Sequence, residues 1–586
     1  LEDHFGQLST LSLAPAGKGT LEVLAMQDVH LALTAVRLED VAAGFRRGPL
    51  DAFSTLGDST GIGLISDPTT NFLRGFDPRP AGDPDPLRIY AAQGSVCAQR
   101  SGACTPDARS LPTQVTAPKP MDVFAGQDVM AGTWQSQNNG PGDISVLRAG
   151  RDLYEVGLQA TGEGSALLEA GRSVLLNQYG TASKGGSFFG LGNRTDQLGQ
   201  RLNQALPAGK GADVYVLAGT ANGVDYDAFA AVYLDPSNAH HVPRTYLPEL
   251  AAYMKELGFK PMADADLVAA FRTLPLARRE IFLDRVYFAE LKQTGIDYND
   301  PASPRFHSYQ RGFRAISTLF SRDPSTIDSA HQGDVILNSK SFETQTDGDL
   351  NILAPYGHVA VGADVLPASV DPTKGGLVTR RGGSIRVMSD GNIDLFTSRV
   401  FTLEGGDITL WTSDGSITAG AGSKTSVFQK PLTYTMDNAA VVAVDAFGLQ
   451  TGAGIGVLDA LDNSGDRPRS RLDLIAPRGE VNAGDAGIRV VGDINIAAQA
   501  VVGVENIQVS GSAAGVPKVE APNVAALTSA SQVAQAAAKE GVGPEAQPRT
   551  AVADLPSIIT VEVLGYETEA GDDASERKKK GPPDGK

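Results

Sequence analysis

Two stretches of the sequence, residues 382–395 (GGSIRVMSDGNIDL) and residues 405–419 (GGDITLWTSDGSITA), follow one pattern. Each begins with paired glycines, continues as a strand of alternating apolar and polar residues, turns at Ser-Asp-Gly and ends in a second alternating strand. The isoleucine that opens the first strand recurs from Ile385 to Ile408. This interval of about 23 residues is typical of one coil of a solenoid. The repeat therefore predicts that the chain folds as stacked coils.

Further copies of this two-strand pattern occur on both sides of these stretches. They are residues 21–31 (LEVLAMQDVHL), 144–156 (ISVLRAGRDLYEV), 166–176 (ALLEAGRSVLL), 350–362 (LNILAPYGHVAVG) and 472–484 (LDLIAPRGEVNAG). One coil cannot bury its apolar residues alone, so coils stack and each strand pairs in parallel with its counterpart in the next coil. The predicted fold class is mainly β, a right-handed parallel β-helix with coils of about 20–24 residues. An array of β-sandwiches is the alternative, but it would not produce a two-strand unit of this length.

The alternation also assigns side chains to the two faces of each strand. We expect Ile385, Val387, Ile408 and Leu410 to point into the core. We expect Arg386 and Thr409, at the intervening positions, to meet solvent.

Residues 225–321 break the pattern, because glycines thin out and apolar residues recur at helical spacing. We expect an inserted α-helical subdomain here. Its four predicted helices cover residues 246–257 (before Gly258), 264–274, 276–294 (before Gly295) and 309–320.

Four parts of the chain follow from these patterns. The first part of the solenoid is expected at residues 1–224, with a loop at 70–118, and the second part at residues 322–520. The helical insertion at 225–321 separates them. Residues 521–586 are expected to form an Ala-rich segment, a lone strand at 555–565 and a disordered charged tail.

Composition and charge exclude several classes of function. The 586 residues are 41% hydrophobic, enough for a sizeable core, and carry a formal net charge of −18. Such a charge repels phosphate backbones, so we expect no nucleic-acid partner. No run of about 18 apolar residues exists, so we expect no transmembrane segment.

The N-terminus carries neither an initiator Met nor a signal peptide, so the sequence is interpreted as a mature or excised piece of a longer protein.

The only two cysteines, Cys97 and Cys104, lie close together in a loop-like segment with a glycine between them. An exported protein can use such a pair to staple a loop, so we expect a disulfide bond. Neither a histidine nor a second cysteine pair is nearby, so a metal site is not expected there.

No catalytic or cofactor motif stands out. A Walker loop, a strand–GxGxxG–helix fingerprint, a GxSxG elbow and an HExxH pair are all absent from the sequence. The adjacent His240 and His241 do not face one point, and no third ligand accompanies them. Acidic residues at the corners favour turns through their own hydrogen bonds, although calcium binding between coils is the alternative. These acidic corner residues are Asp347, Asp349, Asp390, Asp407 and Asp414. No metal, no cofactor and no catalytic residue is therefore predicted.

Because parallel β-helices include polysaccharide lyases and hydrolases, an enzyme has to be weighed. Hydrolysis needs two carboxylates about 5–9.5 Å apart across a groove. Outward acids such as Asp394, Glu404 and Asp473 could pair by chance on an acidic rod. The solenoid offers only Trp134 and Trp411 for stacking on sugars. We therefore expect that the chain is not an enzyme.

Several long segments, in order along the chain, resemble the C-terminal region of filamentous-haemagglutinin-family exoproteins, in a branch whose C-terminal domain has no assigned function. The segments that carry the resemblance are residues 405–425 (GGDITLWTSDGSITAGAGSKT), 481–510 (VNAGDAGIRVVGDINIAAQAVVGVENIQVS), 267–312 and 557–565 (SIITVEVLG). The resemblance implies two-partner secretion, in which an outer-membrane β-barrel transporter recognises an N-terminal secretion domain that is not visible in this chain. It also implies a surface adhesin or filament, and it supplies no catalytic residues.

The leading hypothesis is a secreted exoprotein at the bacterial cell surface, in which a rod displays the helical insertion and attaches to an unknown receptor or matrix polymer. A β-helical polysaccharide-degrading enzyme is the first alternative. A second alternative is the stalk of a contact-dependent toxin system, which predicts a toxic domain at the extreme C-terminus, where only a charged tail follows Gly565. The helical insertion is interpreted either as a plate that covers one face of the solenoid or as a partner-binding head.

Overall fold

The structure is a computed structural model. It describes residues 10–13, 20–33, 35–38, 85–100, 105, 111–117, 119–138, 140–176, 188–190, 210–320, 333–338, 340–344, 347–363, 375–380, 382–422, 427–428, 449–450, 452–458 and 470–517. The predicted Ala-rich segment, lone strand and charged tail of residues 521–586 lie outside the described residues.

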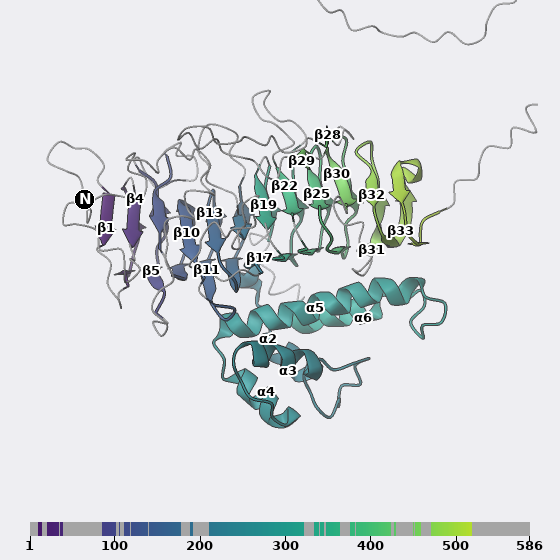
Figure 1. Cartoon of the computed structure of the whole chain (residues 1–586), viewed down its shortest axis with the longest axis horizontal. Helices are drawn as coiled ribbons and strands as arrows, with labels where there is room; N and C mark the ends of the chain where they lie inside the picture. Colours follow the sequence, from purple (N-terminus) through teal and green to yellow (C-terminus); the bar gives the residue numbers. More distant parts are fainter. Residues whose placement is uncertain are drawn as a thin grey trace, which may run out of the picture. The chain divides into compact units, whose positions relative to one another are not determined.

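The repeating unit is a coil of three parallel strands (Figure 1). One strand of each coil belongs to a 12-stranded parallel sheet, and the other two belong to a sheet of 21 strands. Within the larger sheet the longer strands pair with one another and form row 1, while the short strands that follow them form row 2. The sequence pattern predicts rows 1 and 2 as its two alternating strands. The predicted two-strand unit is wrong, because each coil contains a third strand. This strand belongs to the 12-stranded sheet and lies between the sequence repeats quoted above.

The strands of the three rows are bounded as follows. The 12-stranded sheet holds β1 (Thr10–Leu13), β4 (Ala35–Leu38), β7 (Gln114–Thr116), β10 (Thr133–Gln137), β13 (Gly157–Thr161), β16 (Phe188–Gly190), β19 (Ser341–Thr344), β22 (Gly376–Thr379), β25 (Arg399–Thr402), β30 (Gly454–Val457), β32 (Ile488–Val490) and β34 (Ile507–Val509). Row 1 holds β2 (Glu22–Ala25), β5 (Leu87–Ala91), β8 (Met121–Ala125), β11 (Ile144–Ala149), β14 (Ser165–Ala170), β17 (Asp213–Ala218), β20 (Leu350–Ala354), β23 (Ile385–Ser389), β26 (Ile408–Thr412), β31 (Arg471–Asn482), β33 (Asp493–Val502) and β35 (Ala513–Ala514). Row 2 holds β3 (Val29–His30), β6 (Val96–Ala98), β9 (Val129–Ala131), β12 (Leu153–Tyr154), β15 (Val174–Leu175), β18 (Val335–Ile336), β21 (Val359–Ala360), β24 (Ile393–Asp394) and β27 (Ile417–Thr418). The long strands β31 and β33 run through both rows, and β28 (Val427–Phe428) pairs with β29 (Leu449–Gln450) in a separate antiparallel ribbon.

The strand registers confirm the parallel β-helix. Ile385 of β23 pairs with Ile408 of β26, the interval that the sequence repeat gives. Other coils depart from the predicted 20–24 residues, since Ile408 pairs next with Leu472, 64 residues further along. The extra length lies in the connections, where insertions leave the stacking of the strands intact.

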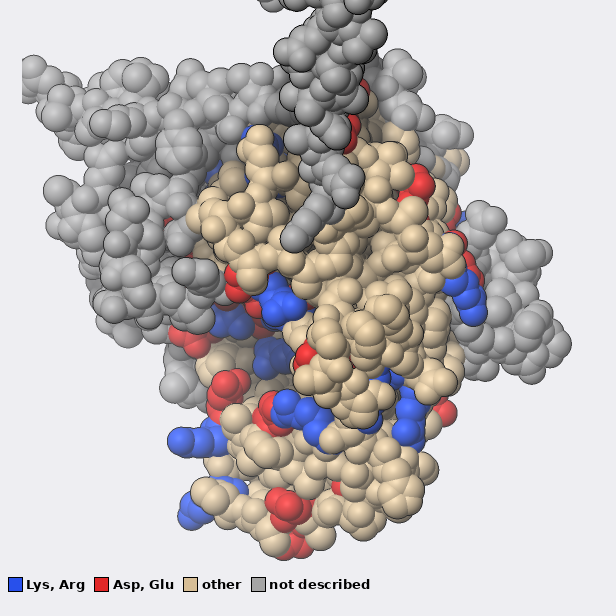
Figure 2. All heavy atoms as spheres, turned by 90° about the vertical axis from the view of Figure 1, so that its right-hand side faces the viewer, with Lys and Arg blue, Asp and Glu red and all other residues tan. Residues whose placement is uncertain are grey.

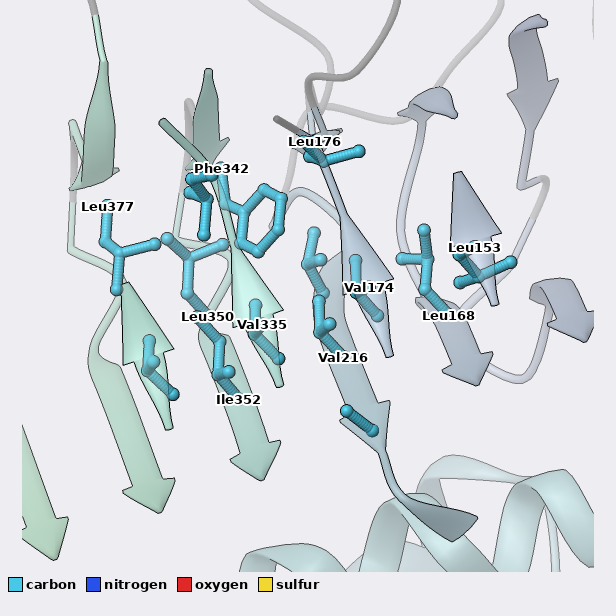
Figure 3. Close-up of a cluster of buried hydrophobic side chains, with 14 of the residues drawn as sticks. Leu153, Leu168, Val174, Leu176, Val216, Val335, Phe342, Leu350, Ile352 and Leu377 are labelled. Carbon is cyan, nitrogen blue, oxygen red and sulfur yellow. The ribbon is translucent and has the colours of Figure 1, made fainter. Parts of the chain in front are cut away.

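The core of the β-helix is a continuous column of inward-facing aliphatic side chains from all three rows. In Figure 3, Phe342 of β19, Leu350 of β20 and Val335 of β18 point into the same interior. Ile385, Val387, Ile408 and Leu410 also belong to this column, as predicted, and each is fully buried. Burial of this kind stabilises a fold by about 1.5–3 kcal/mol for each large aliphatic side chain.

The helical segment is inserted at a single corner, between β17 of row 1 and β18 of row 2. Its five helices are α2 (Tyr226–Tyr233), α3 (Leu247–Glu256), α4 (Asp264–Arg272), α5 (Leu276–Asn299) and α6 (Gln310–Leu319). Val224 and Phe320 form an antiparallel bridge at the base of the insertion, so the chain leaves and re-enters the β-helix at neighbouring points. We call residues 225–319 the helical module.

The helices differ from the sequence prediction in two respects. Helix α2 was not predicted, although Asp225 caps it by accepting a hydrogen bond from the Ala228 amide. Helix α5 does not end before Gly295 but continues to Asn299. Gly295 is therefore not a helix terminator, and its role is in packing, as described below.

The predicted loop at residues 70–118 is also wrong for the residues that the structure describes. Strands β5, β6 and β7 lie within it and pair with the neighbouring coils. Strands β6 and β7 contain three residues each and show no alternation that a pattern could detect, whereas the five residues of β5 do alternate and were overlooked. Within the described residues, no helix has the length and apolar character needed to cross a membrane.

Candidate functional site: the helical module on row 1

The helical module packs on the outer face of row 1 and forms a second hydrophobic core with it (Figure 1). Eight consecutive row-1 strands, from β11 to β33, contribute outward-facing side chains to this core. The side chains are those of Val146, Leu167, Tyr215, Leu217, Leu353, Met388, Trp411, Ile475 and Ala497. The module therefore covers row 1 from β11 to β33, as the plate interpretation of the sequence expects.

Two glycines allow the helices to approach the strands closely. A Cβ atom on Gly312 of α6 would lie 2.5 Å from the ring of Trp411. A Cβ atom on Gly295 of α5 would lie 2.7 Å from the side chain of Ile475. Both distances are too short for real contacts, so these helical glycines are required by the packing and not by a turn.

One of the two row-1 side chains that were expected to meet solvent is buried. Thr409 is 2% exposed, whereas the side chain of Arg386 remains 27% exposed and donates to Asp349 and Asn351. The prediction of solvent contact is wrong for Thr409. Its physical reason is that alternation predicts which side chains point away from the β-helix core but not whether another element covers them.

Ion pairs line the edge of row 1 where its strands begin. Asp213 pairs with Lys210 and with Arg285 of α5, and Lys292 of α5 pairs with Asp407 at 2.6 Å. Burial opposes ionisation of Asp349, but Arg386, Lys210 and the Ser384 amide outweigh it and lower the pKa of this carboxyl. The module is thus fixed in register on row 1 by charge pairs as well as by apolar packing.

A second charge cluster lies between the N-terminal half of α5 and strands β11 and β14. Arg148 donates to Glu169 and, at 3.4 Å, to Glu280 of α5. Asp284, one helical turn further along, accepts a hydrogen bond from the Tyr226 hydroxyl of α2 at 3.1 Å. Glu280 is 3% exposed and Asp284 is fully buried. Arg148 therefore contacts two of the three carboxyl groups, Glu169 and Glu280, while the third, Asp284, is bonded to Tyr226.

The pKa values in this acidic cluster follow from burial. Desolvation, together with the neighbouring charge of Glu169, raises the pKa of Glu280 to about 7 in spite of Arg148 and Arg279. Desolvation and the charge of Glu280 raise the pKa of Asp284 well above its usual value. Burial likewise raises the pKa of the Tyr226 hydroxyl.

Exposed charges of both signs lie together on one face of the molecule (Figure 2). On the face drawn in Figure 2, acidic and basic side chains of described residues lie next to each other over the lower, helical part. Arg279 with Asp227 and Arg244 with Glu249 are pairs of this kind. This mixture does not form a strongly basic or acidic patch on that face.

Acidic and hydroxyl side chains at the corners join successive coils. The side-chain oxygen of one coil accepts a hydrogen bond from the backbone amide at the equivalent position of the next. Before row 2 these acceptor–amide pairs are Asp28–Ser95, Ser95–Asp128, Asp128–Asp152, Asp152–Ser173, Ser173–Asp334, Asp334–His358, Asn392–Ser416 and Ser416–Glu480. Before row 1 they are Asp213–Asp349, Asp349–Ser384, Ser384–Asp407, Asp407–Arg471 and Asp493–Ser512.

These ladders include two of the acidic corner residues that the sequence raised as calcium candidates, Asp349 and Asp407. Asp349 and Asp407 act as backbone acceptors and also pair with Arg386 and Lys292, and Asp414 pairs with Arg478. Among the described residues, no group of three or more His, Cys, Asp or Glu side chains is arranged to hold a metal ion. His240 and His241 lie in the turn after α2.

Asp152→Ala tests the contribution of one ladder position. Asp152 is 4% exposed, accepts the Ser173 amide at 3.0 Å and pairs with Arg172. Its removal leaves a buried amide without a partner, so we expect a loss of about 1–3 kcal/mol in the free energy of unfolding. Urea unfolding followed by circular dichroism measures it, with the exposed Asp414→Ala as control; equal losses in both variants would contradict the role of the ladder.

Three of the side chains that were weighed for an enzyme are buried. Asp473 is fully buried, where it accepts hydrogen bonds from Arg471 and Asn495. Trp134 and Trp411 are also fully buried, one in the β-helix and one beneath the module. None of these three side chains can contact a sugar in solution.

Cys97 lies in β6, is 4% exposed and is disulfide-bonded. Its predicted partner, Cys104, lies outside the described residues, so the Cys97–Cys104 bond stays a prediction. We expect no free thiol when the chain is denatured without reductant and two after reduction. A thiol count of two before reduction would contradict the pairing.

Sequence reasoning missed the residues that define this site. The outward row-1 positions that α5 and α6 cover carry Leu353, Met388, Trp411 and Ile475. In the same register the uncovered β2, β5 and β8 carry Leu24, Tyr90 and Phe124, so apolar residues at outward positions do not by themselves mark the covered face. Glu280, Asp284, Glu290 and Arg311, charged residues buried within the module, gave no pattern either.

Residues 405–518 match the family model described as filamentous haemagglutinin family outer membrane protein. The matched stretch runs from the glycines before β26 to the end of the described coils and includes Trp411 and Ile475 of the docking face. No curated protein and no solved structure matches the chain significantly. The resemblance stated from the sequence is confirmed for this stretch, since residues 405–518 are similar to the filamentous haemagglutinin family of outer membrane proteins.

Proposed function

We propose that this chain is part of a secreted surface exoprotein that mediates attachment, with the β-helix as its rod. The observation that carries the proposal is the family match of residues 405–518, which falls on coils of an uninterrupted parallel stack. Attachment is the role that the family match supports, and no group of His, Cys, Asp or Glu side chains in the described residues is arranged to hold a metal ion.

The helical module is the part of the described structure best suited to contact a partner. Helices α5 and α6 pack on row 1, and α3 and α4 lie on the far side of α5, away from the strands (Figure 1). Because the module shares a core with row 1, it presents α3 and α4 from a rigid base. Preorganised contact surfaces lose less entropy on binding.

Family membership also supports a route to the cell surface. We propose export by two-partner secretion, through an outer-membrane transporter that recognises a secretion domain outside this chain. After export, the partner to which the protein attaches is a surface receptor or a matrix polymer.

Attachment can be measured with beads that carry the purified chain. We expect such beads to adhere to epithelial cells, to bacterial cells or to immobilised matrix, and soluble chain to compete. In a second step, Glu256→Lys with Asp266→Lys reverses exposed charges on α3 and α4, whereas Asp485→Lys with Glu505→Lys does so on the β-helix as a matched control. Reduced adhesion of the first variant alone supports display by the module.

Two results would contradict the proposal. One is adhesion no greater than that of beads coated with heat-unfolded chain on all three surfaces. The other is release of reducing ends or unsaturated uronates from a polysaccharide by the purified chain, abolished by a single substitution of an outward Asp or Glu. That result would support the enzymatic alternative.

A further inference from the structure

The acidic cluster beneath α5 is buried where the helical module meets row 1. It brings together Glu169 of β14 and Glu280 and Asp284 of α5, with Arg148 of β11 as the basic partner. The second carboxyl oxygen of Asp284 is buried and accepts no hydrogen bond from any described residue. A buried carboxylate with a vacant lone pair and no adjacent cation is strongly disfavoured, whereas a neutral carboxylic acid at the same place is tolerated.

The charges of the cluster balance only if it holds protons. Arg148 and an ionised Glu169 form one neutral pair. Ionisation of Glu280 and Asp284 would then add two negative charges within the interface. If both carry protons, the buried cluster is neutral.

Apart from Arg148, the described positive charge near the cluster is Arg279, next to Glu280 on α5. Its charge lowers the pKa of Glu280 without outweighing burial, and its guanidinium pairs with the exposed Asp227 of α2. Tyr226, also on α2, donates its hydroxyl proton to Asp284. On the strand side, Asp122 of β8 adds a further negative charge near Arg148.

We propose that this cluster makes docking of the helical module proton-dependent, so that the module is held most firmly in mildly acidic surroundings and opens more readily as the pH rises to neutrality and above. In the docked state, Glu280 and Asp284 are closed off from water between α2, α5 and row 1. Undocking would hydrate them and release their protons. The consequence for a surface protein is that the covered face of row 1 becomes accessible according to the pH of its surroundings.

The sign follows from the direction of the shifts. The pKa of Glu280 is raised from 4.5 to about 7 in the docked state. Its contribution to docking is therefore fully present below pH 4.5, declines as the pH rises and is lost once the pH has passed about 7. Asp284, whose pKa is also raised, extends the decline to higher pH. Since each pKa unit corresponds to a tenfold change, the opening equilibrium should increase by about 300-fold across this window.

Hydrogen exchange of the full chain, read by mass spectrometry between pH 5.5 and 8.5, measures the opening. The lower limit avoids the isoelectric point of about 4.9. After correction for intrinsic exchange, we expect the protection of peptides from α2 and the N-terminal half of α5 to fall as the pH rises. Peptides from β23 and β26 should keep their protection and serve as the internal reference. Equal protection of the module peptides across the whole pH range would overturn the proposal without any variant.

Substitutions separate protonation from a merely structural role. Glu280→Gln and Asp284→Asn imitate the protonated acids, so the module in these variants should remain protected at pH 8.5 and its pH dependence should flatten. Glu249→Gln removes an exposed carboxyl group of α3 and should retain the full pH dependence. If both cluster variants lose protection at every pH and keep the slope of the unmodified chain, the carboxyl groups are ionised in the docked state and the proposal is wrong.

Discussion

Replacing Arg311 by methionine is expected to lower the free energy of unfolding of the helical module by about 3–5 kcal/mol. Arg311 of α6 donates two hydrogen bonds to Glu290 of α5, at 2.6 and 2.9 Å, and a third to Asp297 at 3.3 Å. Glu290 is fully buried. Its only other side-chain donor among the described residues is the Tyr246 hydroxyl. Removing the guanidinium leaves a buried carboxylate without a counter-charge. The unfavourable free energy of that uncompensated charge accounts for the expected loss of stability.

The ionised state of this arginine is secure in the folded protein. Burial disfavours the charge of Arg311, but the hydrogen bonds and charge of Glu290 outweigh it and raise the pKa of the guanidinium. The same carboxylate, together with burial, raises the pKa of the Tyr246 hydroxyl. Helices α5 and α6 and the entry to α3 therefore converge on one buried carboxylate.

Urea unfolding at pH 7, followed by circular dichroism at the helical minimum, measures this effect. Arg88→Ala is the matched control, because the Arg88–Glu22 pair is partly exposed and should contribute less than about 1 kcal/mol. In the double variant Arg311→Met with Glu290→Leu, the unpaired charge is absent and most of the loss should be recovered. A double variant as unstable as the single one would show that the arginine acts through its packing.

The sequence predicts those features of the fold that are specified by residues within one coil. The alternation and spacing of Ile385 and Ile408 predict the parallel stacking, because strand registers repeat within one coil and local residues specify them. The third strand of each coil escapes prediction. In β25 (Arg399–Thr402) all four residues are buried, so no alternation marks the strand.

The site depends on contacts between residues far apart in the chain. Gly295 looks like a helix terminator in sequence and Gly312 lies within a predicted helix, and only the positions of Ile475 and Trp411 show that both are contact points. Similarly, Glu280 and Arg148 are 132 residues apart and meet only because the module returns to row 1. Local pattern contains no information about which strand a distant helix will cover, so this part of the site could not be predicted.

Excising the helical module is expected to convert the chain into an aggregating protein. The excision is geometrically simple, because the Asp225 amide donates to the Leu319 carbonyl at 2.8 Å, so a short Gly-Ser link can replace residues 225–319. It would expose Leu353, Met388 and Trp411 on adjacent row-1 strands. Each large apolar side chain loses about 1.5–3 kcal/mol of burial, and a contiguous apolar strip of this kind promotes association.

A rescue variant distinguishes this cause from a general failure to fold. The same excision combined with threonine at Leu353, Met388, Trp411 and Ile475 gives row 1 a polar outer face with residues that favour strands. Size-exclusion chromatography with light scattering should show soluble aggregates for the plain excision and a monomer for the rescued one. Circular dichroism should report a β signal for the rescued variant.

The two outcomes decide between the interpretations of the insertion. If the plain excision yields a soluble monomer with an intact β signal, the module is an independent head attached at one corner, and its shared core contributes little. If only the rescued form is soluble, the apolar face of row 1 requires its cover. In that case, a proton-dependent opening of the module changes the surface that the β-helix presents, and attachment through that face should follow the pH in the same direction as the hydrogen exchange.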